Sequence, residues 1–293
     1  MKTGFPLGLR YAVAGALSFS VMSTFAKLAG DRLPTQEIVL FRGILTTLLT
    51  LHALRRIGVS PWGRERGLLL LRGLFGYAAL SCFLWAVVRL PLAETTVLHF
   101  TNPVFTAFLA AVFLGEILGR KEVLFAFLAL GGVVIVARPG FLFGDLSGLD
   151  PIAVAVALAG AILSAAAYTT ARRLTQTNDP LVIVLSFAVV SMVASLPASI
   201  PVFVMPEGKD WFFLLGVGVA TQGGQVFVTR ALQLEKAGRV MAVGYLQIVF
   251  AALLGLLVFR EVPDLWTGVG AAVVVASTFL LGRIHPKTAP RGR

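Results

Sequence analysis

The chain alternates long apolar stretches with short polar connections along its whole length. Each stretch has about 16 to 24 residues, enough for an α-helix rising 1.5 Å per residue to cross an apolar bilayer core of about 30 Å. The stretches are continuously apolar instead of alternating, which favours helices over a β-barrel. The pattern predicts ten transmembrane helices, near residues 9–29, 37–54, 67–88, 93–114, 122–138, 151–171, 181–204, 211–232, 238–259 and 265–283.

One segment occurs twice. Ala86–Glu116 aligns without a gap on Ala231–Glu261, 145 residues later. A repeat of five helices is odd-numbered, so the two halves are predicted to enter the membrane from opposite sides. Such inverted repeats suit alternating access about a site at mid-membrane. We therefore divide the chain into a first repeat at 1–142, an inverted second repeat at 143–285 and a basic cytoplasmic tail at 286–293.

The distribution of lysine and arginine predicts the orientation. Eighteen of the 25 lie on the side of the N-terminus if every predicted helix crosses the membrane, and Arg72 and Arg239 are counted among them. Five lie on the other side, and Lys27 and Arg42 fall inside helices. Cytoplasmic connections carry the excess of positive charge, so both termini are predicted to be cytoplasmic. The net charge of +11 then indicates attraction to anionic lipid at that face, and it does not imply nucleic-acid binding.

Composition narrows the function. Hydrophobic residues make up 57% of the chain, charged residues 13%, and the mean hydropathy is +0.88, as expected of an all-α integral membrane protein. Phosphate-binding loops, His-Glu-x-x-His motifs, paired aspartates at mid-membrane and nucleophile elbows are missing from the sequence. We therefore expect neither an enzyme nor an ATPase, no ATPase subunit and no cofactor or metal.

Several motifs support a family resemblance. Leu40-Phe41-Arg42-Gly43 opens the second predicted helix, Asn102-Pro103 lies in the fourth, and Phe113-Leu114-Gly115-Glu116 closes it. With the late Lys27 of helix 1 and the doubled five-helix pattern, these residues resemble EamA-type transporters of the drug/metabolite transporter superfamily. The second half departs from the pattern, with Gln247-Ile248 in place of Asn102-Pro103 and with Phe187 or Ala188 in place of Arg42.

The resemblance implies a multi-pass exporter of amino acids or similar small metabolites in a bacterial inner membrane, with the aromatic-amino-acid exporters as one candidate type. Other substrates remain open, namely S-adenosylmethionine, purine nucleosides or drugs. A lipid scramblase or a non-transporting assembly partner is a further alternative.

Polar and aromatic residues within the predicted helices are the candidates for substrate binding, because polar groups that face lipid are costly. Hydrogen bonds between helices, or to the residue's own backbone, are the competing explanation for each of them. The candidates are Tyr77, Ser81, Trp85, His99, Asn102, Ser164, Tyr168, Gln222, Gln225, Tyr245 and Gln247.

Charged residues in and beside the helices have their own predicted roles. Lys27 and Arg42 are possible charge anchors for a substrate carboxylate; the alternatives are snorkelling for Lys27 and an ion pair with Glu37 or Asp31 for Arg42. Glu116 and Glu261 are predicted to pair with cations or with amides of the next helix as structural elbows.

All fourteen acidic residues fall in loops or at helix ends, so none lies at mid-membrane to carry a coupling ion. This placement predicts uniport or weakly coupled transport, with His99 the one plausible proton carrier. A site with few charges predicts a zwitterionic or neutral substrate, because a polyanion would need more basic residues at depth than Lys27 and Arg42.

Overall fold

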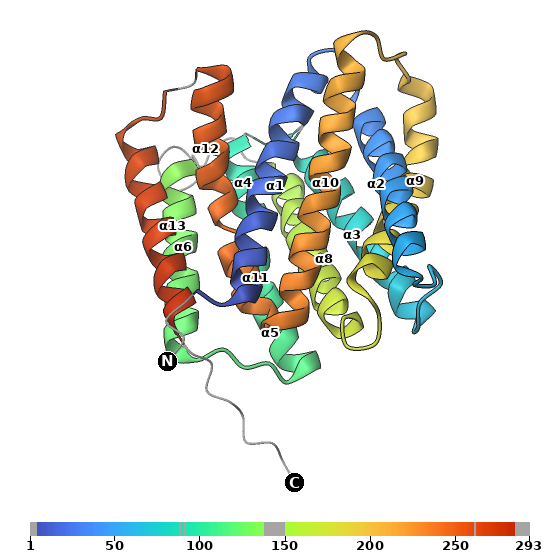
Figure 1. Ribbon diagram of the computed structural model, residues 1–293. Coiled ribbons are helices and arrows are strands. Elements are labelled where there is room, and N and C mark those ends of the chain that lie inside the picture. The colour runs from blue at the N-terminus through green and yellow to red at the C-terminus, as the bar shows by residue number, and fades with distance from the viewer. Residues whose placement is uncertain (1–4, 88, 91, 138–149, 261, 285–293) are drawn as a thin grey trace.

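The computed structural model describes residues 5–87, 89, 90, 92–137, 150–260 and 262–284, and every regular element in these ranges is a helix (Figure 1). The predicted tail 286–293, the boundary between residues 142 and 143, and Glu261 lie outside these ranges. The first half contains α1 (Leu7–Gly30), α2 (Thr35–Ile57), α3 (Arg66–Val87), α4 (Leu92–His99), α5 (Asn102–Leu114) and α6 (Arg120–Ala137). The second contains α8 (Pro151–Leu174), α9 (Pro180–Ser199), the 3₁₀ turn η1 (Ile200–Val202), α10 (Lys209–Leu234), α11 (Ala237–Val243), α12 (Leu246–Phe259) and α13 (Leu265–Arg283).

Nine segments of the described chain are long and apolar enough to cross a membrane. Two of them, Thr95–Leu114 and Ala237–Phe259, each combine a short helix with a longer one. The all-α membrane architecture predicted from the hydrophobic pattern is therefore confirmed. The predicted span 122–138 coincides with α6, an 18-residue helix that begins with three charged residues and packs along α13. A total of ten spans stays a prediction.

The two composite segments correct the prediction of continuous helices at 93–114 and 238–259. The first is interrupted between α4 and α5, where Pro103 has no amide to donate to the carbonyl four residues earlier. The second is interrupted between α11 and α12 without a proline. There the amides of Gly244, Tyr245 and Gln247 each bond a carbonyl three residues earlier, which tightens the turn. The interruption therefore occurs in both halves although its sequence cause differs.

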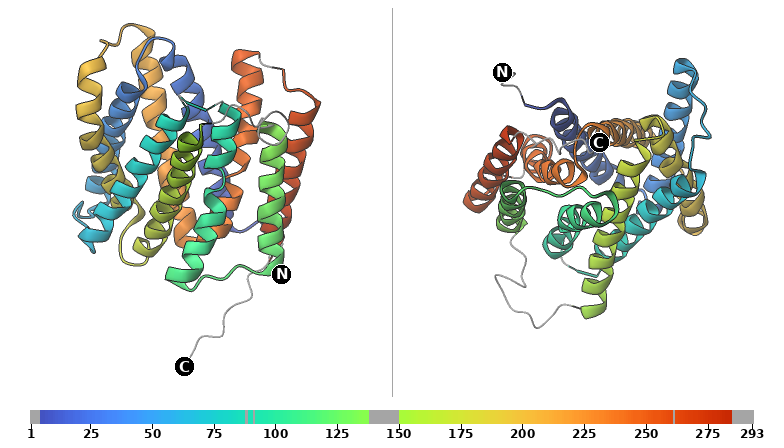
Figure 2. Two further views of the ribbon diagram at one scale, coloured as in Figure 1. Left: turned by 180° about the vertical axis from the view of Figure 1, so that it is seen from behind. Right: turned by 90° about the horizontal axis from the view of Figure 1, so that it is seen from below.

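The spacing of 145 residues also relates the helices of the two halves. Each helix from α1 to α6 starts within two residues of that spacing from its counterpart. The contacts follow the same relation, because α1 packs along α10 as α3 packs along α8, while α2 packs on α9 and α6 on α13. Figure 2 shows the α6–α13 pair at one side of the bundle. The start of α1 lies beside the end of α10, so these two helices run in opposite directions (Figure 1).

Close helix contacts depend on small residues, as is usual in membrane proteins. Gly15 of α1 faces Val228 of α10, and Gly160 of α8 faces Cys82 of α3. On α6 and α13, Gly132 and Gly270 bring the two backbones together: a Cβ added to Gly270 would lie 2.6 Å from the Gly132 carbonyl oxygen. Large apolar side chains are exposed around the outside of the bundle, where they suit contact with lipid.

Glu116 connects three helices. Its Oε1 accepts a hydrogen bond from Nε of Arg172 at the end of α8, at 2.6 Å. Its Oε2 accepts the amide of Ala237, the first residue of α11, at 2.9 Å. The predicted elbow thus has both kinds of expected partner, but the amide belongs to α11 instead of the next helix along the chain.

Arg239 of α11 is fully buried, which corrects its assignment to the cytoplasmic surface. Its Nε lies 3.3 Å from Oε1 of Glu122 on α6, and its Nη1 lies 3.1 Å from Oε2 of Glu235. Nη2 donates to the carbonyls of Leu281 and Ile284 at the end of α13, at 3.0 and 2.9 Å. Burial raises the pKa of Glu235. This network fixes α11 against α6 and α13.

Replacing Gly270 with alanine should lower the free energy of unfolding by about 1–3 kcal/mol, because the added methyl group meets the backbone of α6. Gly268 on the same helix provides the control, since nothing lies within 4 Å of a Cβ added there. Thermal unfolding in detergent micelles measures both variants. Equal melting temperatures for Gly270→Ala and Gly268→Ala would show that this contact is absent.

Replacing Arg239 with glutamine should lower the free energy of unfolding by about 3–5 kcal/mol, because Glu122 and Glu235 lose the charge that compensates them. Arg283→Gln removes an exposed cation from the end of α13 and should cost less than about 1 kcal/mol. The same unfolding measurement applies to both. If the two substitutions have equal effects, Arg239 does not hold these helices together.

Candidate functional site

Two arginines and an aromatic ring form a polar cluster within the bundle. Arg72 of α3 is 3% exposed, and its Nη2 donates to Oε1 of Gln225 on α10 at 3.3 Å. Its guanidinium carbon lies 4.6 Å from the centroid of Phe187 on α9 and 5.9 Å from that of Tyr168 on α8. The assignment of Arg72 to the cytoplasmic surface is therefore wrong. Six residues separate it from the start of α3, about 9 Å along the helix, too far for a surface position.

Arg42 of α2 approaches the same ring, with its guanidinium carbon 6.0 Å from the Phe187 centroid. The predicted ion pair with Glu37 is not formed. The Glu37 carboxylate is fully buried, and its Oε2 accepts the amide of Val204 at 2.9 Å instead. Asp31, the other predicted partner, forms no ion pair with Arg42 either. Nη2 of Arg42 and Nε of Arg72 are buried without a hydrogen-bond partner among the described residues.

The local sequence makes room for this cluster. A Cβ added to Gly76, one turn beyond Arg72, would lie 2.6 Å from Nη1 of Arg72 and 2.7 Å from the Phe187 ring. Gly73 brings α3 equally close to Val190 of α9. Phe187 stands 145 residues after Arg42, so the aromatic counterpart of Arg42 in the second half contacts both Arg42 and Arg72. The Tyr168 hydroxyl lies close enough to both guanidinium groups to interact with their charge.

Charge compensation is missing at this cluster. Within the described ranges, the ion pairs involve Arg32, Arg172 and Arg239, and neither Arg42 nor Arg72 pairs with a carboxylate. The acidic side chains in those ranges lie in connections, at N-caps or in the first or last turn of a helix, as predicted from the sequence. Two positive charges are thus held in the bundle by a glutamine and aromatic rings.

The candidates on α3 have mixed surroundings. The Tyr77 hydroxyl donates to the carbonyl of Ala194 on α9 at 2.9 Å, and Ser81 donates to the Tyr77 carbonyl at 3.0 Å. Trp85 packs beneath Arg89, whose guanidinium carbon lies 3.7 Å from its ring centroid. These hydrogen bonds and contacts match the alternative explanation, in which the side chains hold helices together.

A second polar group lies at the interruption between α4 and α5. The His99 ring centroid is 4.8 Å from that of Phe83, and Phe100 is 5.9 Å from Tyr245. Asn102 donates to Oγ of Ser164 on α8 at 3.4 Å. Oδ1 of Asn102 and the hydroxyl of the fully buried Tyr245 have no hydrogen-bond partner in the described part of the chain. This group joins the two interrupted helices to α8.

The remaining candidates are dispersed. Gln222 accepts a hydrogen bond from Thr50 of α2 at 2.9 Å, and the backbone carbonyl of Gln247 accepts one from Ser20 of α1 at 2.8 Å. Lys27 is exposed, with its ammonium 4.2 Å from the Phe259 centroid. Lys27 is 145 residues before Arg172, so cations occupy equivalent positions in the two halves. The structure brings Arg42, Tyr168 and Gln225 together with Arg72, a residue that the sequence analysis placed elsewhere.

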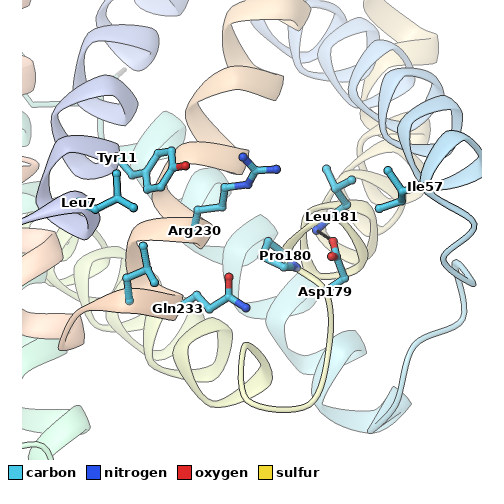
Figure 3. Close-up of a pocket in the computed structure, with 9 residues that line it drawn as sticks. Leu7, Tyr11, Ile57, Asp179, Pro180, Leu181, Arg230 and Gln233 are labelled. Atoms are coloured by element: carbon cyan, nitrogen blue, oxygen red, sulfur yellow. Dashed lines mark hydrogen bonds between the residues drawn. The ribbon is translucent and has the colours of Figure 1, made fainter.

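Two cavities lie away from this centre. One of 370 Å³ lies between the ends of α1, α2, α9 and α10, where Tyr11, Arg230 and Gln233 contribute to its lining (Figure 3). The other, of 280 Å³, is almost wholly apolar and lies between α5, α6 and Gly238 of α11. Neither cavity is lined by a residue predicted to bind substrate. The polar clusters within the bundle are therefore the candidate functional site.

Comparisons with known proteins agree with this architecture. A solved crystal structure superimposes with a TM-score of 0.75 and 19% identity, covering 91% of this chain and 95% of that one, and this likeness concerns the fold alone. The pseudopaline exporter CntI of Pseudomonas aeruginosa is 33% identical over 277 residues, which cover 94% of this chain and 96% of that protein. Solute carrier family 35 member G1 of Homo sapiens is 34% identical over 92% of this chain and 77% of its own length.

The EamA-like transporter family matches the chain twice, at residues 6–138 and 151–283. The names of the relatives and of the family indicate membrane transporters and not enzymes, and both bacterial and human proteins are among them. On these matches, which together cover most of its length, the chain belongs to the EamA-like transporter family.

Proposed function

We propose that the protein is a secondary transporter that exports amino acids or similar small metabolites by alternating access. The single observation that carries this proposal is the set of buried polar groups at the centre, which comes from helices of both halves. Arg42 and Arg72 belong to the first half, and Tyr168, Phe187 and Gln225 to the second. A site shared in this way changes its access when one half moves against the other.

The proposed mechanism requires two inverted repeats of five transmembrane helices each. Support comes from the common spacing of 145 residues, from the exchanged helix contacts and from the opposite directions of α1 and α10. The two family matches fall one in each half. We propose that α6 and α13 end the repeats as the fifth and tenth spans.

The proposed location is a bacterial inner membrane, with both termini cytoplasmic and anionic lipid at that face. The charge asymmetry of the connections supports this orientation. The termini of the described chain lie together, since Phe5 packs against Gly282 at the end of α13.

The small metabolite is proposed to be an amino acid on the strength of the donors and aromatic rings at the site. Asn102, Ser164 and Tyr245 offer hydrogen bonds, while Phe100 and Phe187 offer apolar surface. The 33%-identical relative, which is named as an exporter of pseudopaline, makes another class of small metabolite the second candidate. Transport is proposed to be uniport or weakly coupled, because the described acidic side chains lie at helix ends and His99 is the plausible proton carrier.

Counterflow into proteoliposomes tests this function. Vesicles preloaded with one unlabelled amino acid should take up the labelled form when the protein is present, and a panel of amino acids, purine nucleosides and S-adenosylmethionine gives the selectivity. Asn102→Ala should reduce uptake by about tenfold, equivalent to about 1.4 kcal/mol of lost binding. Ser23→Ala, which removes an exposed hydroxyl on α1, is the control and should leave uptake unchanged.

Two outcomes would contradict the proposal. If no amino acid in the panel exchanges, the substrate class is wrong. If uptake follows an imposed pH gradient and His99→Ala does not alter that response, the weakly coupled mechanism is wrong.

A further inference from the structure

We propose that Arg42 and Arg72 bind two carboxylate groups of the transported molecule, so that the substrate is a small dicarboxylate. This inference rests on the proposed transport function and names its substrate class. It replaces the expectation of a zwitterionic or neutral substrate, which followed from placing Arg72 at the surface.

The first argument is charge. Arginine stays protonated in proteins, so neither side chain can remove its charge by losing a proton. Buried charges are ordinarily paired, and lone cations within a membrane mark functional sites. Among the described residues no carboxylate pairs with Arg42 or Arg72. Two uncompensated positive charges match a ligand of charge minus two.

The second argument is hydrogen bonding. A guanidinium carries five N–H donors in a planar fork that fits a carboxylate with two parallel bonds. Arg72 uses Nη2 on Gln225, while its Nε has no partner in the described chain, and Nη2 of Arg42 has none either. Each arginine therefore retains donors for an anionic group.

The third argument is position. Both guanidinium groups lie against the ring of Phe187, so the two guanidinium carbons are no farther apart than 4.6 and 6.0 Å together allow. This separation suits a short carbon chain that carries a carboxylate at each end, with its methylene groups on the ring. Gly76 leaves the space in which Arg72 and Phe187 meet. The Tyr168 hydroxyl, close to both charges, offers a further donor.

The competing explanation is that the arginines only hold helices together through the aromatic rings. A cation–π contact offsets part of the cost of burying a guanidinium, and Arg72 has two such contacts. A purely structural arginine would make no distinction between a dicarboxylate and its monoamide. Ligand selectivity therefore separates the two explanations.

The test measures binding by the purified full chain in detergent, with isothermal calorimetry and thermal unfolding. The probes are succinate, glutarate, adipate and L-glutamate, each beside its monoamide of nearly equal size: succinamate, glutaramate, adipamate and L-glutamine. At least one dicarboxylate should bind and raise the melting temperature, and its monoamide should bind at least about tenfold more weakly. Arg42→Gln and Arg72→Gln should each weaken dicarboxylate binding by about tenfold or more.

Matched controls are Arg56→Gln on α2 and Arg66→Gln on α3, two exposed arginines on the same helices, and both should bind as the wild type does. Arg72→Lys keeps the charge without the fork and should retain part of the affinity. If the glutamine variants do not fold, the preference of the wild type for each dicarboxylate over its monoamide still decides the question.

The proposal is overturned if no dicarboxylate binds, if the monoamides bind equally well, or if binding survives in both glutamine variants. The proposed transport function fails separately, in counterflow. Selective binding without any exchange would leave the dicarboxylate site standing and remove the transporter, while exchange of monocarboxylate amino acids without dicarboxylate preference would do the reverse.

Discussion

A bilayer offers no hydrogen-bond partner to a peptide group or a guanidinium, and this constraint governs both the frame and the centre of the protein. The backbone responds by forming helices throughout the described chain, with glycines where helices approach closely. Polar side chains turn inward, where Arg239 meets Glu122 and Glu235. Arg42 and Arg72 also lie within the bundle, but no carboxylate in the described ranges compensates them. The contrast between a neutralised arginine and two that are not is the main clue to function.

The relation between the two halves explains how such a centre is built. A duplicated five-helix unit supplies equivalent backbones, and the helix bounds and contacts follow the spacing of 145 residues throughout. Function requires that equivalent positions differ. Arg42 has Phe187 as its counterpart, and these two residues face each other instead of performing the same task. Backbone similarity thus provides a frame for alternating access, and side-chain differences provide a site with a definite charge.

Much of the frame is visible in the sequence, since apolar run length and the repeat spacing identify the helices. The interruption at Gly244 is not, because it depends on a tight turn without proline. The site is less visible. Arg72 was counted as a surface residue because it lies near a basic connection, although its depth in the apolar run was a signal. The pairing of Glu37 with the Val204 amide depends on how α2 meets the connection after α9, which no local pattern records.

The central claim is that the two arginines hold an anionic substrate between the halves of the bundle. A cryo-electron microscopy map of the protein in lipid nanodiscs with saturating glutarate tests it most directly. The account predicts density for the ligand across Phe187, with one carboxylate within hydrogen-bond distance, about 2.7–3.2 Å, of each guanidinium. Ligand density elsewhere, or Arg42 and Arg72 each paired with a carboxylate of the protein itself, would contradict it.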